Sequence, residues 1–88
     1  MRKSTTIINQ LGLHARAAAK LVQTANGFAS EITLYRDDRD ANAKSIMGVM
    51  MLAAPRGTVI EIEAEGADAE QALAAILALI EDRFGEEQ

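Results

Sequence analysis

Residues 58–65, TVIEIEAE, contain the pattern that most constrains the fold of this chain. Apolar and acidic residues alternate with a period of two, which is typical of a strand with one buried face. Three aliphatic side chains are expected to face the core and three carboxylates to face solvent. The inward set is Ile60, Ile62 and Ala64, and the outward set is Glu61, Glu63 and Glu65.

The next segment, residues 66–85, has helical spacing instead. Asp68 is predicted to cap the helix, with Gln71 three residues later completing a capping box, and Gly85 is predicted to end it. The expected buried stripe is Leu73, Ile76, Leu77, Ile80 and Phe84. The acidic tail over residues 81–87 is interpreted as a solvated helix end. A half-buried strand followed by an amphipathic helix predicts a sheet with helices on one face.

The remaining elements are shorter. We predict a strand over residues 4–9, a helix over 15–26, a strand over 30–36, a turn over 37–40, a returning strand over 41–44 and a short helix over 45–52. Gly27 fits a positive φ just beyond the second of these elements. The pair Asn26–Gly27 is also typical of a hairpin turn, but the preceding apolar residues recur every three to four positions and favour a helix end. Those residues are Ala18, Leu21, Val22 and Ala25.

The element order is therefore β-α-β-β-α-β-α. It predicts an α+β open-faced β-sandwich, in which three helices cover one face of a four-stranded, mostly antiparallel sheet. At 88 residues, with 49% hydrophobic and only 3% aromatic residues, we expect one domain over residues 1–88 with an aliphatic core.

Composition excludes several classes of function. The chain has no cysteine, so disulfides and cysteine-based metal sites or catalysis are excluded. The net charge of −4 and the scattered basic residues are not typical of a nucleic-acid-binding protein. No apolar run has the length of a signal peptide or a membrane span. We expect a cytoplasmic monomer with no cofactor and no metal.

His14, in the segment GLHARAAAKL, is the only histidine. It directly precedes the predicted helix over 15–26, where unpaired backbone N–H groups and the positive end of the helix dipole favour an anion. Arg16 adds a fixed positive charge, and Gly12 allows a sharp turn before the ring. These features predict an anion site that contains a nucleophile. A phosphoryl group on the imidazole could be stabilised by Arg16 and by the backbone N–H groups of Ala15 and Arg16.

Other interpretations of His14 have less support. A lone histidine in a small protein is often a surface or partly buried residue with no special role. A metal site needs further ligands, and the chain has no second histidine. A serine triad lacks a recognisable nucleophile motif. A general base in a hydrolase is conceivable, but no neighbouring residue specifies a substrate.

The segments GLHARAAAKLVQTANGF, NAKSIMGVMMLAA and ALAAILALIEDRFGE together resemble HPr, the histidine-containing phosphocarrier family of the bacterial phosphoenolpyruvate-dependent phosphotransferase system. The resemblance covers essentially the whole chain and extends to the nitrogen-branch paralogue, NPr. It implies the same open-faced fold. It also implies a carrier that is not an enzyme, that receives its phosphoryl group from enzyme I and that passes it to enzyme IIA proteins. HPr kinase/phosphorylase is a further partner where that enzyme exists.

The resemblance also assigns individual residues. His14 matches the phosphorylated histidine, which accepts the group on Nδ1, and Arg16 matches the active-site arginine. Ser45 matches the regulatory serine. An apolar patch of Ile46, Met47 and Met50 matches the surface that docks onto enzyme I and enzyme IIA. Ala17 departs from the family pattern, which has proline there, and we expect it to tune the phosphohistidine rather than to abolish it.

Two of these positions also have structural interpretations. Ser45 opens the short helix over 45–52 and is suited to cap it, a role compatible with regulation by phosphorylation. Within that helix Val49 and Leu52 are expected to pack inward, while some methionine side chains stay exposed. Two alternative functions are a mainly regulatory protein controlled through Ser45, and a small-ligand-binding domain, for which the sequence has no pocket signature.

Overall fold

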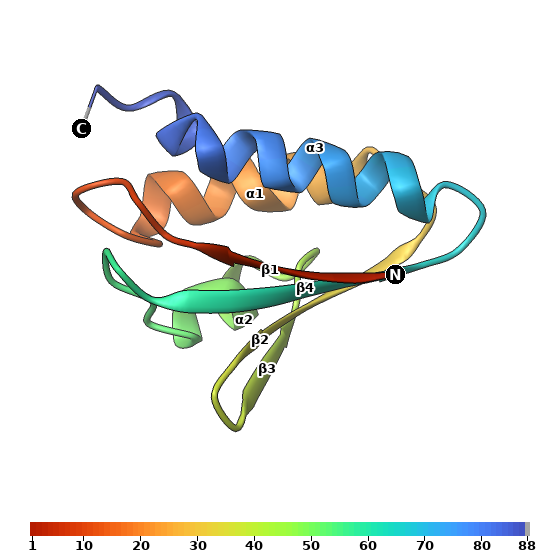
Figure 1. Ribbon diagram of the computed structural model, residues 1–88, viewed down its shortest axis with the longest axis horizontal. Helices are drawn as coiled ribbons and strands as arrows, with labels where there is room; N and C mark the ends of the chain where they lie inside the picture. Colours follow the sequence, from red (N-terminus) through yellow and green to blue (C-terminus); the bar gives the residue numbers. More distant parts are fainter. Residues whose placement is uncertain (88) are drawn as a thin grey trace.

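The computed structural model describes residues 1–87 and contains a four-stranded antiparallel sheet with strand order β1-β4-β2-β3. Two long helices, α1 and α3, lie side by side over one face of this sheet, and α2 lies beside the β2–β3 hairpin (Figure 1). The elements are β1 (Arg2–Thr6), α1 (Ala15–Asn26), β2 (Glu31–Arg36), β3 (Arg39–Asn42), α2 (Ile46–Met51), β4 (Val59–Glu65), α3 (Ala69–Glu81) and the short 3-10 helix η1 (Arg83–Gly85). The predicted fold class and element order are confirmed.

Strand β4 lies between β1 and β2 and follows the predicted alternation. Ile60, Ile62 and Ala64 are buried, and the glutamates between them face the open side of the sheet. Register pairing places Ile62 opposite Leu34 of β2, which is also fully buried. The inner face is therefore aliphatic, as the composition predicts.

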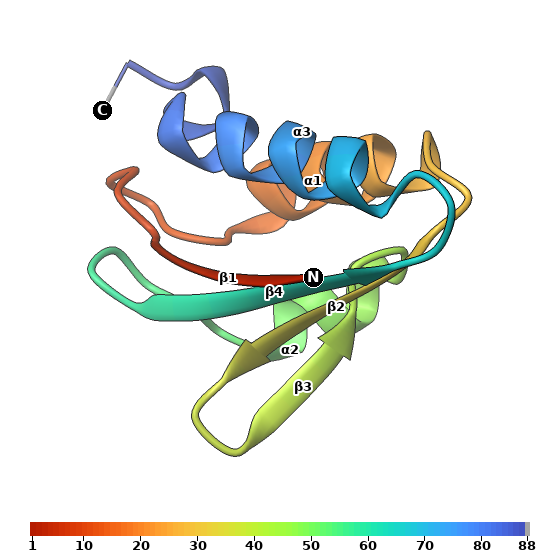
Figure 2. The same cartoon turned by 45° about the vertical axis from the view of Figure 1, so that its right-hand side comes forward.

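The helices close the core from one side. Leu21 of α1 and Ile76 of α3 are fully buried, and α1 packs against both α3 and α2. Figure 2 shows α1 and α3 together on one side of the sheet. In α2, Val49 and Leu52 at its end point inward and are buried, as expected. Each such aliphatic side chain contributes about 1.5–3 kcal/mol when fully buried.

All four predicted strands need correction: two are misplaced and two begin one residue too early. The first strand is residues 2–6, not 4–9, because the regular pairing with β4 ends at Thr6 and Val59. Ile7 still hydrogen-bonds Thr58 and Gly57 through its backbone, and its side chain packs into the core. The third is residues 39–42, not 41–44, because the turn contains only Asp37 and Asp38. Beyond Asn42 the chain turns again, since the Asn42 side chain accepts a hydrogen bond from the Lys44 amide at 2.8 Å. The strands predicted over 30–36 and 58–65 each begin one residue later.

Two predictions about helix ends need correction: the backbone angle of Gly27 after α1 and the position at which α3 ends. Gly27 has φ of −75° and is not left-handed, because its amide donates to the Thr24 carbonyl in a tightened last turn. The helix end itself is confirmed over the hairpin alternative. Helix α3 ends at Glu81, not at Gly85. Phe84 takes a positive φ of 55° within η1, which brings its fully buried ring back into the core.

Asp68 precedes α3 as predicted, but the capping box is wrong. Its carboxylate makes no hydrogen bond to its own helix. It accepts hydrogen bonds from the amides of Ala29 and Ser30, both at 2.9 Å, and from the Ser30 hydroxyl at 2.5 Å. The side chain therefore joins the start of α3 to the segment that leads into β2. The hydrogen bond from Ser30, followed by that from the Ala29 amide, lowers the pKa of Asp68 below its ordinary 3.8.

We predict that Asp68→Asn lowers the free energy of unfolding at pH 7, because an amide cannot accept all three hydrogen bonds. A lowered folded-state pKa contributes stability that is present above the ordinary pKa and is lost as pH falls through the folded value. The difference between wild type and variant should therefore shrink as pH falls from 5 to 2 in urea unfolding. Asp38→Asn, in the exposed turn, is the control; a difference that stays constant with pH contradicts this role.

Candidate functional site

His14 is the residue that precedes the first turn of α1, with extended backbone angles of φ −72° and ψ 177°. Its carbonyl accepts the first helical hydrogen bond, from the Ala18 amide at 2.8 Å. Its ring makes no capping hydrogen bond to the helix. The amides of Ala15, Arg16 and Ala17 at this end have no carbonyl within the helix to bind, and they form a positive, donor-rich site beside the imidazole.

Gly12 sets the approach of the chain to His14. It has φ of +66°, and a Cβ at this position would lie 2.5 Å from the Ala54 carbonyl oxygen and 2.8 Å from the Pro55 Cα. The next amide, of Leu13, donates to the same Ala54 carbonyl at 2.9 Å. Only glycine combines this left-handed angle with so close a backbone approach. The turn predicted from the sequence is confirmed, and its cause is the loop that follows α2.

The interpretation of the acidic tail over residues 81–87 as a solvated helix end holds for Glu81, Asp82 and Glu87, which are exposed, but is wrong for Glu86, which contacts the histidine. Glu86 Oε2 lies 2.6 Å from His14 Nε2. Its other oxygen, Oε1, accepts a hydrogen bond at 3.0 Å from Asn9 Nδ2, which also donates to the Gly12 carbonyl at 2.8 Å. Lys20 of α1 holds the preceding residues by donating to the Phe84 carbonyl at 2.6 Å. The contact therefore belongs to a network rather than to a free terminus.

The pKa of Glu86 is lowered by the balance of two opposing effects. Partial burial raises it, but the hydrogen bonds from His14 and Asn9 and the charges of His14 and Lys20 together outweigh that effect. The Glu86 carboxylate is therefore ionised at neutral pH. An ionised carboxylate can only accept hydrogen bonds, so the ring must donate from Nε2.

The residues of the predicted anion site lie around this ring. A shallow hollow of about 560 Å³ is lined by Gln10, Leu11, His14, Ala15, Arg16, Glu86 and Glu87. The structure thus brings together three residues that the sequence singled out, His14, Ala15 and Arg16. Arg16 is exposed, so its guanidinium is accessible to an incoming anion. With Nε2 bound to Glu86, the ring nitrogen left as a nucleophile is Nδ1.

Ser45 precedes α2 and caps it, as expected. Its Oγ accepts a hydrogen bond from the Gly48 amide at 3.1 Å. Four large apolar side chains of the same helix are exposed: Ile46, Met47, Met50 and Met51. The loop after α2 reaches the histidine, because Ala53, Ala54 and Pro55 line a second hollow with Leu11, Leu13 and His14. An apolar surface therefore extends from α2 toward the anion site.

The sequence interpretation missed Glu86, Asn9 and the exposed Leu11. One available signal was Phe84, four residues after Ile80, whose burial draws the tail back over α1. Asn9 offered a weaker signal as a polar residue after two isoleucines. Its position against Glu86 depends on tertiary contacts that the local sequence does not encode.

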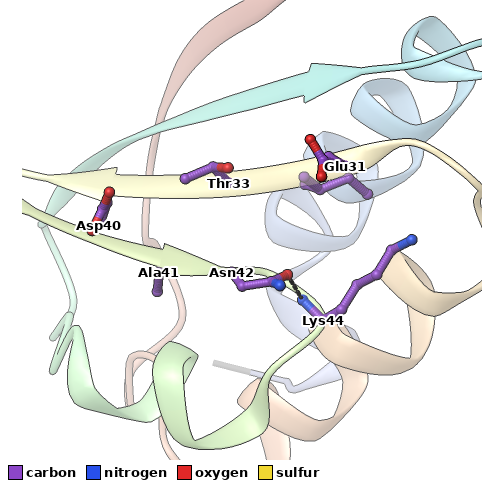
Figure 3. A pocket seen from close by; sticks show the side chains of 7 residues that line it. Glu31, Thr33, Asp40, Ala41, Asn42 and Lys44 are labelled. Carbon is purple, nitrogen blue, oxygen red and sulfur yellow. Dashed lines mark hydrogen bonds between the residues drawn. The ribbon is translucent and has the colours of Figure 1, made fainter.

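Another hollow lies at the β2–β3 edge, between Glu31, Thr33, Asp40, Asn42 and Lys44 (Figure 3). The Lys44 ammonium donates to the Phe28 carbonyl at 2.7 Å, and the hollow contains no residue that the sequence singled out.

Among residues 1–87, no cluster of three His, Cys, Asp or Glu side chains could hold a metal ion. Nor does this part of the chain contain a helix long and apolar enough to cross a membrane.

Comparison with known proteins places this geometry in a family. A model described as "PTS HPr component phosphorylation site" matches residues 1–82. A phosphocarrier protein HPr from Cupriavidus necator is 55% identical over 98% of this chain and 97% of its own, and one from Neisseria meningitidis is 54% identical with the same coverage. A phosphocarrier protein NPr from Shewanella violacea is 43% identical over 98% of this chain and 94% of its own. The crystal structure of HPr-C-His from Thermoanaerobacter tengcongensis has a TM-score of 0.96 and 48% identity, covering 100% of this chain and 99% of that one.

We predict that Gly12→Ala destabilises the protein by about 2 kcal/mol or more, because it combines a left-handed alanine with a backbone clash. The free energy of unfolding in urea measures the cost. Gly57→Ala is the matched control: it also has a positive φ, of +89°, but open space around its Cα. Equal destabilisation by the two variants would show that the Ala54–Pro55 contact adds nothing to the requirement for glycine.

Proposed function

Since this chain belongs to the HPr family of phosphocarrier proteins in the phosphotransferase system, we propose that His14 is the residue that carries its phosphoryl group. The protein is a carrier and not a catalyst. The observation that supports His14 is its geometry: the ring stands at the N-terminus of α1, and Nε2 is bound to Glu86. The remaining nitrogen, Nδ1, is free to react next to unpaired amides and Arg16.

The proposed reaction is a transfer between two imidazoles. The Nδ1 lone pair of His14 attacks phosphorus on phosphorylated enzyme I, and the new N–P bond forms as the donor N–P bond breaks. The electron pair of the broken bond returns to the donor nitrogen. The Arg16 guanidinium and the amides of Ala15 and Arg16 stabilise the phosphoryl oxygens. The reverse of these steps passes the group to a histidine of an enzyme IIA protein.

Ala17 occupies the position of the usual family proline and is fully buried in the first turn of α1. Unlike proline, it supplies an N–H group at this end of the helix. The helix forms without the proline, and the extra donor adds to the group of amides that faces the phosphate. We propose that the substitution tunes the stability of the phosphohistidine and leaves its formation intact.

Partner docking is proposed for the exposed face of α2. Met47 and Met51 are 67% and 72% exposed, and Ile46 and Met50 are also exposed. Flexible thioethers adapt to several partner surfaces, which suits a carrier that must bind enzyme I and then an enzyme IIA protein. Our sequence prediction named Ile46, Met47 and Met50, and the exposure of Leu11 and Met51 extends the proposed surface.

Ser45 is proposed as a regulatory phosphorylation site for an HPr kinase/phosphorylase. Its partly buried hydroxyl already caps α2, so a phosphate there lies at a helix N-terminus and is tolerated by the fold. The same phosphate stands next to Ile46 and the docking surface, where its charge and hydration oppose apolar contact.

A mainly regulatory role is not favoured, because relatives at 54–55% identity are named HPr and the chain keeps His14. We further propose a cytoplasmic monomer with one domain over residues 1–88.

We predict that incubation with enzyme I and phosphoenolpyruvate adds one phosphate, which brief acid removes. Intact-mass spectrometry at neutral pH and after acid gives the readout, and the single histidine assigns the label to His14. His14→Ala should accept none, while its free energy of unfolding changes by no more than about 1 kcal/mol, since the ring does not cap α1. An unlabelled wild-type protein, beside an HPr control that is labelled, contradicts the proposal.

Ser45→Asp should slow phosphoryl acceptance from enzyme I without unfolding the domain, because a carboxylate can still cap α2 but places charge on the docking surface. Ser45→Ala removes only the cap and should cost about 1 kcal/mol of stability with little change in transfer rate. Stopped-reaction transfer assays and urea unfolding separate the two effects. Equal transfer rates for both variants would argue against Ser45 as a control point.

A further inference from the structure

We propose that Glu86, oriented by Asn9, is a positioning residue for phosphoryl transfer: it keeps the ring proton of His14 on Nε2 and presents Nδ1 as the nucleophile. This inference rests on the proposed function and adds residues that neither the sequence interpretation nor the family resemblance assigned. It concerns the His14–Glu86–Asn9 cluster, which joins the segment before α1 to the tail after η1.

The hydrogen-bond pattern fixes the role of each group. Asn9 Nδ2 donates to the Gly12 carbonyl at 2.8 Å, and a carbonyl can only accept, so the amide orientation of Asn9 is determined. The same nitrogen then donates to Glu86 Oε1 at 3.0 Å. Glu86 Oε2 is left to accept from His14 Nε2 at 2.6 Å. A neutral imidazole that donates from Nε2 has its lone pair on Nδ1.

The cluster is partly buried, and neighbouring residues hold the tail that carries Glu86 in place. Asn9 is fully buried, its Oδ1 has no hydrogen-bond partner within the described residues, and Glu86 is only 16% exposed. Phe84 anchors the tail in the core, and Lys20 binds its carbonyl. An exposed ion pair has little directional effect, whereas a shielded and doubly bound carboxylate holds the ring in one orientation.

The same contact acts after transfer. When Nδ1 forms the N–P bond while Nε2 keeps its proton, the ring becomes a phosphoimidazolium with a positive charge. Glu86 is positioned to stabilise that charge through Nε2–H, as a carboxylate does for a protonated histidine in an enzyme. The other charged groups near the ring are Arg16 and Glu87, which line the same hollow, and Lys20, whose charge acts on Glu86. Among residues 1–87, none of these three groups hydrogen-bonds the ring, whereas Glu86 does.

The test compares Glu86→Ala and Glu86→Gln with wild type and with Glu81→Gln, which removes an exposed carboxylate from the last turn of α3. Two readouts are taken on variants whose thermal melts show a folded protein. Proton–nitrogen NMR of the ¹⁵N-labelled imidazole at pH 8 reports the tautomer and the exchange protection of Nε2–H. Rapid-quench assays measure phosphoryl acceptance from phosphorylated enzyme I.

We expect a protected Nε2–H in wild type and in Glu81→Gln, and its loss in Glu86→Ala. Phosphoryl acceptance by Glu86→Ala should fall about tenfold, the scale typical of losing a group that orients a reacting histidine, with Glu86→Gln in between. If Glu86→Ala matches the control in both readouts, or accepts phosphate faster, the positioning role is overturned while the carrier role stands. A folded wild-type protein that accepts no phosphate overturns both.

Discussion

The burial of one aliphatic sheet face under α1 and α3 is the constraint on which the rest of the structure depends. Ile60 and Ile62 on β4, with the stripe of α3, fix the distance and direction between sheet and helices. At one end of the resulting sandwich three segments meet: the connections over residues 7–14 and 52–58, and residues 82–87, which follow α3 and contain η1 (Figure 1). The proposed phosphoryl-transfer site lies at this junction, so the core positions the site while its proposed reactive atoms come from the connecting segments.

Each of the three segments contributes a different part. Residues 7–14 bring His14 to the N-terminus of α1 through the turn at Gly12. Residues 52–58 provide the Ala54 carbonyl against which that turn is packed, and they connect the site to the exposed apolar face of α2. Residues 82–87 supply Glu86. A carrier must bind several partners and release each of them, and the partly buried His14, the proposed nucleophile, beside an adaptable apolar surface meets both needs.

Local sequence patterns predicted the elements well where burial alone decides them. The alternation around Ile62 and the apolar stripe through Ile76 each allow only one face of their element to be buried. The turn at Gly12 follows from its lack of a Cβ. Predictions were wrong where a distant group competes for a side chain. Asp68 has the spacing of a capping box, but it binds the amides before β2. Glu86 looks solvated in sequence because its partner is 72 residues away. Such choices depend on tertiary contacts that no local window contains.

The most direct test of this account is the identity of the phosphorylated ring nitrogen. Protein labelled with ¹⁵N in its single histidine is phosphorylated by enzyme I, and the one-bond coupling between ³¹P and ¹⁵N is measured for each ring nitrogen. The account predicts coupling to Nδ1, with the proton signal remaining on Nε2 beside Glu86. Coupling to Nε2 would contradict it, because that nitrogen is the one the structure holds against the carboxylate.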